Sequence, residues 1–294
     1  MLDGTAPARN QPLRRLAACS RRGPAAYSGG SMPIPATLQI DNDLYDRLAD
    51  TWWRENGFLN LLQTTLNPWR VPYFKRILGL LQIDPHGARA LDVGCGGGLL
   101  TEEVAAMGFA VTGIDPSLRS LEIARAHAAQ KSLRIEYRPG YGHDLPFENE
   151  SFDVVFCCDV LEHVADWDAV IRDMARVLRT GGVLMFDTIN RTFASKLRSI
   201  FIAQKWKWTR YAPPNTHVWE MFITPDEIAE SFERHGLVQK DITGTAAKGN
   251  PFQALWLVRQ YSQRRISSAD FGRGIDMTEG PVLSGSYMGY ALKS

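Results

Sequence analysis

A glycine-rich turn, Gly94-Cys95-Gly96-Gly97-Gly98, directly follows the apolar stretch that ends in Asp92 and Val93. Glycines permit positive φ angles and let a ligand approach the backbone closely. The free N–H groups of a helix that starts after such a turn favour a ligand with negative charge. Asp115 ends the next apolar stretch, where a carboxylate is well placed to accept hydrogen bonds from a ribose diol. This arrangement predicts a nucleoside-containing ligand.

Two ligand classes compete for this turn. A dinucleotide-binding turn has the spacing GxGxxG, so that a pyrophosphate rests on the helix N-terminus. Here the spacing is GxGxG, and Asp92 stands just before it. A carboxylate at that point repels a pyrophosphate but attracts a cationic amino group, which favours S-adenosylmethionine. A glycine-rich turn without any ligand is the structural alternative, which Asp115 and the strand–helix–strand context disfavour.

Further candidate ligand contacts lie where other strands are expected to end, because open α/β sheets bind ligands at that edge. Gly142 and His143 follow the third strand and are candidates to flank an adenine. Cys158 ends the fourth strand. It is either part of the pocket wall or a small buried apolar residue.

Asp159, Glu162 and His163 follow the fourth strand at spacings i, i+3 and i+4. If a helix begins here, the three side chains project to one side. Two carboxylates and an imidazole then predict a site for a hard divalent cation with open positions for substrate oxygens. Two alternatives stay open: acidic residues favour helix N-termini for dipole reasons alone, and His163 can act as a general base.

The elements that position these residues alternate between short apolar strands and amphipathic helices from residue 89 onward. Such alternation is typical of an α/β fold with a parallel sheet covered by helices on both faces. The strands are expected at 89–93, 110–115, 134–138, 153–157, 183–188, 237–243 and 286–292, and the helices at 99–107, 117–130, 163–178 and 225–235. Residues 39–82 are expected to form additional N-terminal helices.

Composition excludes several classes of protein. The chain has 294 residues and a net charge of +1, so no global charge favours nucleic acid. It contains no run of about 18 apolar residues, which a membrane-spanning helix requires. Its four cysteines do not form a disulfide framework, which is consistent with a reducing, cytoplasmic compartment.

The charge is unevenly distributed. Residues 1–38 are basic, rich in small residues and predicted to be disordered. They resemble an organelle transit peptide. The alternative is that they are translated from an upstream start codon and that the folded protein begins near Met32. Residues 191–211 contain six basic residues and no acidic residue, interleaved with Phe, Trp and Tyr. This insert, which we extend to residue 217, favours peripheral contact with an anionic membrane over a helix packed on the active site, and disfavours nucleic acid.

The sequence also resembles the ubiquinone-biosynthesis O-methyltransferases over about residues 40–292. The resemblance rests on Asp92–Gly98, Asp115, Asp159–Val164 and Asp187–Arg191, together with shorter matches at Thr51-Trp52-Trp53, Asn67-Pro68-Trp69-Arg70, Asn215-Thr216-His217, Phe222–Ile228 and Tyr287-Met288-Gly289-Tyr290. These proteins are class I S-adenosylmethionine-dependent enzymes that methylate hydroxyl groups of polyprenyl phenols and catechols. The chain departs from the family at Asp159, where Glu is usual, and at Ala165, where Pro is usual.

The resemblance implies a Rossmann-like domain over 39–294 with a seven-stranded sheet whose last strand is antiparallel. It implies donor contacts at Arg70, Gly94, Asp115 and Cys158. It also implies a divalent ion, expected to be Mg²⁺, at Asp159, Glu162 and His163, and membrane contact through the insert. The rival predictions are a metal-independent methyltransferase for a soluble metabolite and a non-catalytic nucleotide-binding or membrane-scaffold protein.

Overall fold

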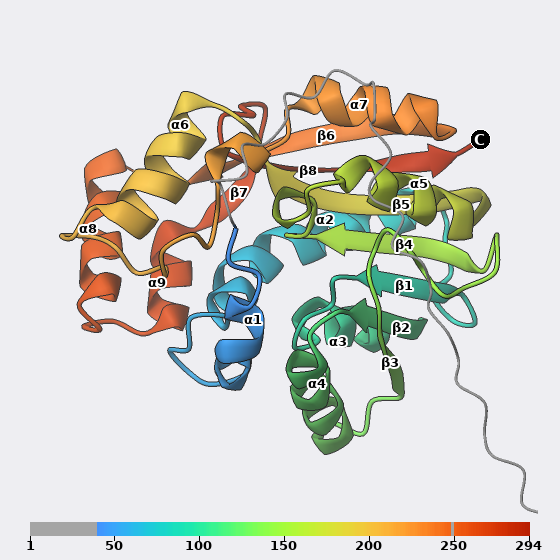
Figure 1. The fold of residues 1–294 in the computed structure, drawn as a ribbon, viewed down its shortest axis with the longest axis horizontal. Helices are drawn as coiled ribbons and strands as arrows, with labels where there is room; N and C mark the ends of the chain where they lie inside the picture. The colour runs from blue at the N-terminus through green and yellow to red at the C-terminus, as the bar shows by residue number, and fades with distance from the viewer. Residues whose placement is uncertain (1–39, 248–249) are drawn as a thin grey trace, which may run out of the picture. The chain divides into compact units, whose positions relative to one another are not determined.

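The computed structural model describes residues 40–247 and 250–294, so the extension predicted to be disordered over 1–38 lies outside the described residues. One eight-stranded sheet forms the centre of the domain (Figure 1). Its strands, in spatial order, are β3 (Ile135–Pro139), β2 (Ala110–Asp115), β1 (Arg89–Val93), β4 (Phe152–Cys158), β5 (Leu178–Ile189), β8 (Ser286–Lys293), β6 (Leu237–Ala247) and β7 (Met277–Gly280).

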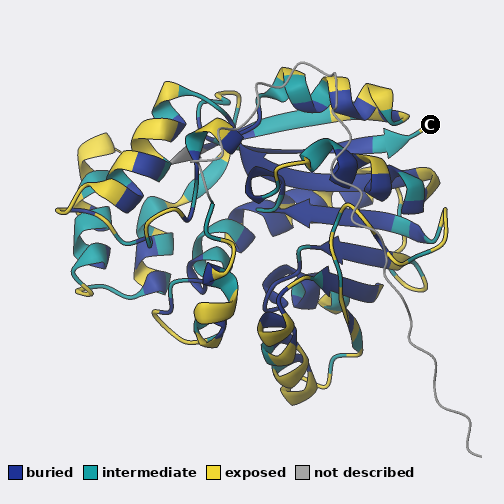
Figure 2. Ribbon diagram, viewed as in Figure 1, coloured by how far each residue is buried: buried dark blue, intermediate teal, exposed yellow. Residues whose placement is uncertain are grey.

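The first five strands in this order are parallel, and β8 runs antiparallel to both of its neighbours, β5 and β6. The predicted α/β fold with an antiparallel last strand is therefore confirmed. In β4 every residue except Asp153 is buried, as expected for a strand covered on both faces (Figure 2). Residues Val93 and Ile114 are register partners, so the ends of β1 and β2 reach the same edge of the sheet.

The predicted count of seven strands is wrong by one. Strand β6 continues beyond residue 243 to Ala247, and its last residues, Gly244–Ala247, pair with β7. Strand β7 has the sequence Met-Thr-Glu-Gly, which is too short and too polar to give an alternating pattern.

Two apolar clusters hold helices against opposite faces of the sheet. Val155 and Cys157 of β4 pack in one cluster with residues of α5 (Trp167–Val177) and α7 (Pro225–Arg234). Val154 and Phe156, the alternate residues, pack in the other cluster with α2 (Asn67–Leu80) and α3 (Leu99–Ala106). Helix α4 (Leu118–Gln130) packs near β3 through a third cluster. The alternation of β4 side chains thus determines which helices cover which face.

The helices expected at 99–107, 117–130 and 225–235 are present with small shifts at their ends. Ser117 caps α4 by accepting a hydrogen bond from the Ser120 N–H, and Thr224 forms a capping box with Glu227 at α7. The predicted N-terminal helical region contains α1 (Leu44–Arg47), the 3₁₀ turn η1 (Ala49–Thr51), the π-helical turn η2 (Leu62–Leu66) and α2.

The helix expected to begin around Asp159 does not form there. Asp159 has a φ of 55°, in the left-handed region, and a 3₁₀ turn η3 covers Leu161–His163. Helix α5 begins only at Trp167, because the Asp166 side chain caps it by accepting from the Ala169 N–H. The spacing i, i+3, i+4 therefore does not place Asp159, Glu162 and His163 on one helical face.

The insert and the segment before β7 contain helices that the sequence patterns did not delimit. The insert forms α6 (Phe193–Ser195) and the π-helix η4 (Lys196–Lys205). The 3₁₀ turn η5 (Trp219–Met221) follows the insert. Helices α8 (Pro251–Ser262) and α9 (Ser268–Ile275) precede β7. Among the described residues, no helix is long and apolar enough to cross a membrane.

Candidate active site

The glycine-rich turn connects β1 to α3 and is held by hydrogen bonds within one strand–helix–strand unit. Gly96 and Gly98 have φ angles of 50° and 83°, which favour glycine. The Asp115 carboxylate accepts hydrogen bonds from the N–H groups of Gly96 at 2.9 Å and Ser117 at 2.8 Å. Burial raises the pKa of Asp115 to about 6, although these two N–H groups lower it. The acid predicted to contact a ribose thus lies directly beside the turn.

Asp92 lies near the end of β1, just before the turn, and is buried. Its carboxylate accepts a hydrogen bond of 2.6 Å from the Thr101 hydroxyl on α3. Burial raises the pKa of Asp92 to about 7, and the Thr101 bond opposes that effect. Asp92 and Asp115 therefore lie on the two neighbouring strands beside the turn, the first buried and the second partly buried.

The other residues predicted to line the ligand pocket, Gly142, His143 and Cys158, differ in how deeply they are buried. A Cβ atom on Gly142 would come within 2.9 Å of a Val93 methyl group, so this loop approaches the start of the turn closely. The His143 side chain is exposed beside Tyr141, with ring centroids 5.4 Å apart. Cys158 is buried at the end of β4, and burial raises the pKa of its thiol well above the ordinary value. The thiol is therefore neutral.

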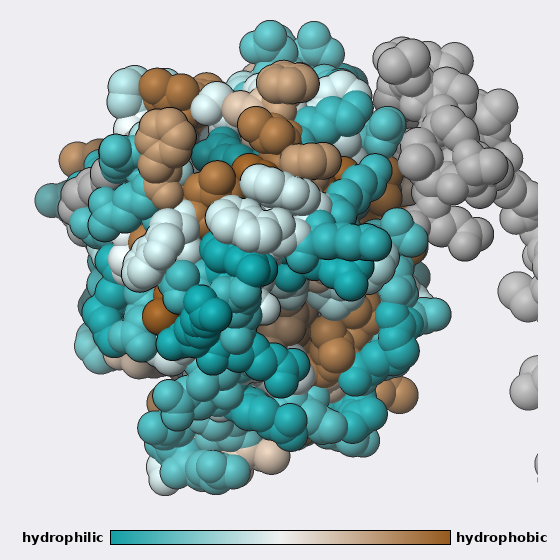
Figure 3. All heavy atoms as spheres, turned by 90° about the vertical axis from the view of Figure 1, so that its left-hand side faces the viewer, coloured by the Kyte–Doolittle hydropathy of each residue, from teal (hydrophilic) through white to brown (hydrophobic). Residues whose placement is uncertain are grey.

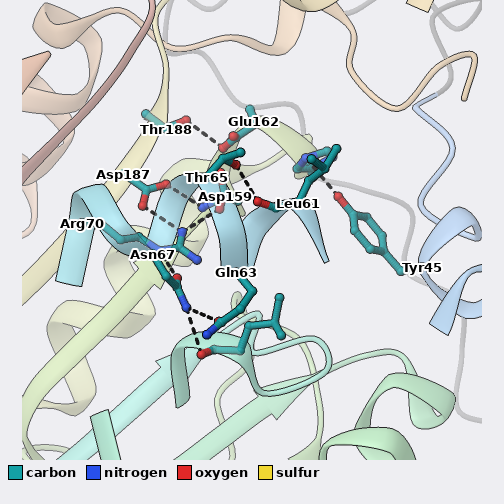
Figure 4. A network of polar contacts seen from close by, with 12 residues as sticks. Tyr45, Leu61, Gln63, Thr65, Asn67, Arg70, Asp159, Glu162, Asp187 and Thr188 are labelled. Atoms are coloured by element: carbon teal, nitrogen blue, oxygen red, sulfur yellow. Dashed lines mark hydrogen bonds and ion pairs between the residues drawn. The ribbon is translucent and has the colours of Figure 1, made fainter. Parts of the chain in front are cut away.

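Arg70 of α2 lies at the centre of a buried polar network (Figure 4). Its Nη1 donates to the carboxylates of Asp159 at 2.6 Å and Asp187 at 3.1 Å. Its Nε donates to Asn67 Oδ1 at 2.8 Å. Burial lowers the pKa of Arg70, but the charges of Asp187 and Asp159 outweigh burial and raise it. Arg70 therefore carries a full positive charge balanced by two carboxylates.

This network engages one of the three residues of the predicted ion site. Asp159 forms an ion pair with Arg70, and its backbone N–H donates to Asp187 Oδ1 at 2.9 Å. Among the described residues, Glu162, His163 and His217 form a group of three possible metal ligands. Each offers one ligand atom, and these atoms all lie within 4.8 Å of one another. Asp159 is not part of that group, because the left-handed turn at residue 159 directs its carboxylate to Arg70.

Glu162 and His163 present two unsatisfied polar atoms at this group. Glu162 is fully buried, and its Oε2 accepts from the Thr188 hydroxyl at 2.8 Å, whereas its Oε1 has no hydrogen-bond partner. His163 Nδ1 is also buried and without a partner. Buried polar atoms are rarely left unpaired, so these two atoms mark a place where a ligand is expected. The rings of His163 and His217 are 5.0 Å apart between centroids.

Burial is the main cause of the shifted pKa values of Glu162, His163 and His217. It raises the pKa of Glu162 well above the ordinary value, and the nearby charge of Asp159 adds to this effect. It lowers the pKa of His163 well below the ordinary value and that of His217 to about 4. Both imidazoles are therefore neutral near pH 7 and can accept a proton or bind a cation.

The segment that leads into Glu162 and His163 packs against the glycine-rich turn at Val160. A Cβ atom on Gly94 would come within 2.3 Å of a Val160 methyl group, so the turn that carries Glu162 and His163 packs on the turn after β1. Sequence reasoning did not assign roles to His217, Tyr45 or Asp187. Each belongs to a segment far from residues 159–163 in the sequence, and no local pattern links these segments.

Comparisons with known proteins agree with this geometry. Residues 91–186 match the methyltransferase domain family. A ubiquinone biosynthesis O-methyltransferase of Methylobacterium sp. (strain 4-46) is 36% identical over 219 residues, which cover 72% of this chain and 86% of the relative. The protein of the same name from Xanthomonas axonopodis pv. citri (strain 306) is 38% identical over 207 residues, covering 70% and 83%.

Solved structures share the fold at low sequence identity. The SAM-dependent methyltransferase from Aquifex aeolicus superposes with a TM-score of 0.52 at 13% identity, covering 87% of this chain and 100% of that chain. The YcgJ protein of Bacillus subtilis gives a TM-score of 0.52 at 16% identity, covering 74% and 97%.

The sheet order, the glycine-rich turn and the paired carboxylates define a class I S-adenosylmethionine-dependent methyltransferase. Within that class, the chain belongs to the ubiquinone biosynthesis O-methyltransferase family. It is accordingly an S-adenosylmethionine-dependent O-methyltransferase.

Proposed function

We propose that the enzyme methylates the hydroxyl group of a hydrophobic phenol or catechol that carries a polyprenyl chain, as in a ubiquinone precursor. The observation that carries this proposal is the contact between Gly94 and Val160, which sets the donor turn against the turn of Glu162 and His163. The names of the curated relatives support a substrate on the route to ubiquinone.

We propose that the donor is held by Arg70, Asp92, Gly94, Gly96, Asp115, Gly142, His143 and Cys158. When bound, S-adenosylmethionine supplies an electrophilic methyl group on a sulfonium sulfur. The carboxylate of Asp115 suits the ribose diol, and that of Asp92 suits the amino group. The hydrogen bonds of Arg70 use Nε and Nη1, so Nη2 is the end of the guanidinium that suits the donor carboxylate.

For the acceptor, we propose that Glu162, His163 and His217 hold a divalent cation. The two unpartnered buried atoms, Glu162 Oε1 and His163 Nδ1, fit this role, and His217 adds a second neutral imidazole. One carboxylate and two imidazoles suit a transition-series ion better than Mg²⁺, which prefers oxygen ligands. Such an ion lowers the pKa of a bound hydroxyl group.

A second role for His163 uses the same nitrogen. As a general base, His163 Nδ1 takes the proton of the substrate hydroxyl while the oxygen attacks the methyl carbon and the carbon–sulfur bond breaks. Because one lone pair serves one role at a time, the two roles exclude each other. Activity that is lost with a chelator and restored by added Mn²⁺ or Zn²⁺ supports the cation, whereas full activity in the chelator supports the general base.

The substrate proposal is tested with a panel of catechols that share one head group and differ in the length of the isoprenoid chain. We expect kcat/KM to rise with chain length, because a longer chain buries more apolar surface. A panel of soluble phenols without a chain serves as the comparison. Equal or higher kcat/KM for the soluble phenols would support the metal-independent alternative with a soluble metabolite as substrate.

We further propose that the insert over 191–211 contacts an anionic membrane, where such a substrate resides. Phe193, Leu197, Phe201, Trp206 and Trp208 are exposed there, and Lys205, Lys207 and Arg210 are exposed among them. Ile200, in contrast, is buried and anchors the insert to the domain. Apolar side chains rimmed by basic ones suit the headgroup region of an anionic bilayer.

Helix α8 extends the same surface. Phe252 is 80% exposed and Trp256 is 56% exposed, and residues 250–265 contain Arg259, Arg264 and Arg265 but no acidic residue. Arg259 Nη1 donates to the Trp208 carbonyl oxygen at 2.6 Å, and its guanidinium lies 4.9 Å from the Trp208 ring centroid. Figure 3 shows this side of the molecule, on which apolar residues gather toward the top among hydrophilic ones.

Cosedimentation with vesicles of mixed phosphatidylcholine and phosphatidylserine tests this contact. The triple variant Lys205→Glu, Lys207→Glu and Arg210→Glu is expected to lose most binding, as is Phe252→Ser with Trp256→Ser. The charge reversal Lys75→Glu with Arg76→Glu, on α2, serves as the control outside the insert and is expected to bind like the wild type. Wild-type binding by the triple variant would contradict the contact through the insert.

A further inference from the structure

The first described residues of the chain meet the candidate ion site at three points. The Asp41 N–H donates to the Asn215 carbonyl oxygen at 3.1 Å, two residues before His217. The Asn42 side-chain amide donates to the His163 carbonyl oxygen at 2.9 Å. The Tyr45 hydroxyl lies 3.2 Å from His163 Nε2. Residues 41–45, which we call the N-terminal clamp, therefore contact both segments that carry the imidazoles.

The ring of Tyr45 is fixed on its other side. It stacks on Trp52 with centroids 6.2 Å apart and meets His163 edge-on at 5.6 Å. The Trp52 indole N–H donates to the Ser120 hydroxyl at 3.0 Å, which ties this stack to α4. Tyr45 thus offers His163 a hydroxyl oxygen at a fixed position.

The contact with Tyr45 distinguishes the two ring nitrogens of His163. Since Nε2 is engaged by the Tyr45 hydroxyl, Nδ1 is the nitrogen that remains without a partner. A histidine that binds a metal donates its other ring N–H to an oxygen, and this bond fixes both the tautomer and the ring orientation. The hydroxyl oxygen of Tyr45 is the acceptor that occupies that position here.

We propose that Tyr45 and Asn42 are positioning residues for the active site. Tyr45 accepts the Nε2–H of His163 and so presents the Nδ1 lone pair, while Asn42 fixes the backbone of the same turn and Asp41 holds the segment of His217 beside it. The clamp thereby assembles two histidines from distant parts of the chain. The inference rests on the proposed cation site for its effect on binding, but the tautomer of His163 can be measured without any ion.

The test compares Tyr45→Phe, Asn42→Ala and the wild type in the full chain, with Co²⁺ as the probe. Tyr45→Phe keeps the aromatic ring and removes only the hydroxyl. Loss of such a supporting bond weakens metal affinity about 10–100-fold. Absorption titrations with Co²⁺ are therefore expected to show at least a tenfold weaker Kd for Tyr45→Phe and a smaller loss for Asn42→Ala. Tyr73→Phe, which removes the hydroxyl that donates to Asp241 at 2.9 Å, is the matched control and is expected to bind Co²⁺ like the wild type.

Nitrogen-15 spectra of the histidine rings give the second readout, in ion-free protein. The wild type is expected to show His163 with a protonated Nε2 and an unprotonated Nδ1, and Tyr45→Phe is expected to lose that preference. A protonated Nδ1 in the wild type, or identical His163 signals in Tyr45→Phe, would overturn the inference. Wild-type Co²⁺ affinity in Tyr45→Phe would also overturn it, whereas failure of the wild type to bind Co²⁺ with the expected tautomer present contradicts the proposed cation site alone.

Discussion

The donor side and the acceptor side of the active site are built in different ways. On the donor side, Asp92, Gly96, Thr101 and Asp115 lie in one strand–helix–strand unit, where Gly96 donates to Asp115 and Thr101 donates to Asp92. On the acceptor side, Glu162 and His163 meet Tyr45, Thr188 and His217, which come from three other segments. The donor side is therefore specified by a local pattern, whereas the acceptor side depends on the assembled fold.

Arg70 links the two sides, and its removal is expected to have the largest effect on stability. Arg70 is 3% exposed, and Arg70→Met leaves the buried carboxylate of Asp187 and the partly buried carboxylate of Asp159 without their counter-ion. Breaking a buried pair in this way costs about 3–5 kcal/mol. Urea unfolding measures the loss. Arg76→Met breaks the exposed pair with Glu279 and is expected to cost less than about 1 kcal/mol. Equal costs for the two variants would contradict the central place of Arg70.

The variant Glu162→Gln is expected to impair the acceptor side while leaving donor binding nearly unchanged. The variant keeps the volume of the side chain but removes its charge when an ion or substrate is bound, so kcat is expected to fall about 100-fold or more. Binding of S-adenosylhomocysteine, measured by calorimetry, is expected to change less than about threefold, because Glu162 lies outside the donor unit. A parallel loss of donor binding would show that the two sides do not act independently.

The variant Asp115→Ala, in contrast, is expected to weaken donor binding. The carboxylate holds the N–H groups of Gly96 and Ser117 and is proposed to bind the ribose, so the variant loses several charge-assisted bonds. We expect S-adenosylhomocysteine to bind about 100-fold more weakly, which corresponds to about 2.7 kcal/mol. Asp144→Ala, on the exposed loop after β3, is the control. Unchanged calorimetric affinity in Asp115→Ala would contradict the donor site.

Asp92→Asn gives a smaller effect that depends on pH. The pKa of Asp92 is raised from 3.8 to about 7 by burial, so the folded state favours the protonated acid. The contribution of Asp92 to the free energy of unfolding is therefore fully present below about pH 4, where the side chain is protonated in both the folded and the unfolded state. This contribution is lost as the pH rises toward 7. Between pH 5 and pH 7.5, the free energy of unfolding of the wild type is expected to fall by about 2 kcal/mol relative to Asp92→Asn. Unfolding curves that shift equally in both proteins over this range would contradict the raised pKa.

The contrast between the local donor side and the acceptor side, which is assembled from distant segments, explains which features the sequence could predict. The alternation of strands and helices, the glycine-rich turn and the places of Asp92 and Asp115 follow from local periodicity and spacing. The ion site was predicted with Asp159 because an α-helix was expected there, but the left-handed turn at Asp159 directs its carboxylate to Arg70. His217 and Tyr45 reach Glu162 and His163 only through tertiary contacts, which a single sequence does not reveal.

Methylation of a phenolic oxygen is tested by the structure of the product, determined by mass spectrometry and NMR after incubation with S-adenosylmethionine and a polyprenyl catechol. We expect one added methyl group, located on a ring oxygen, in the wild type and its near-complete absence in Glu162→Gln. A methyl group on carbon or nitrogen, or no methylated product from any catechol while S-adenosylhomocysteine binds, would contradict O-methylation of such a substrate.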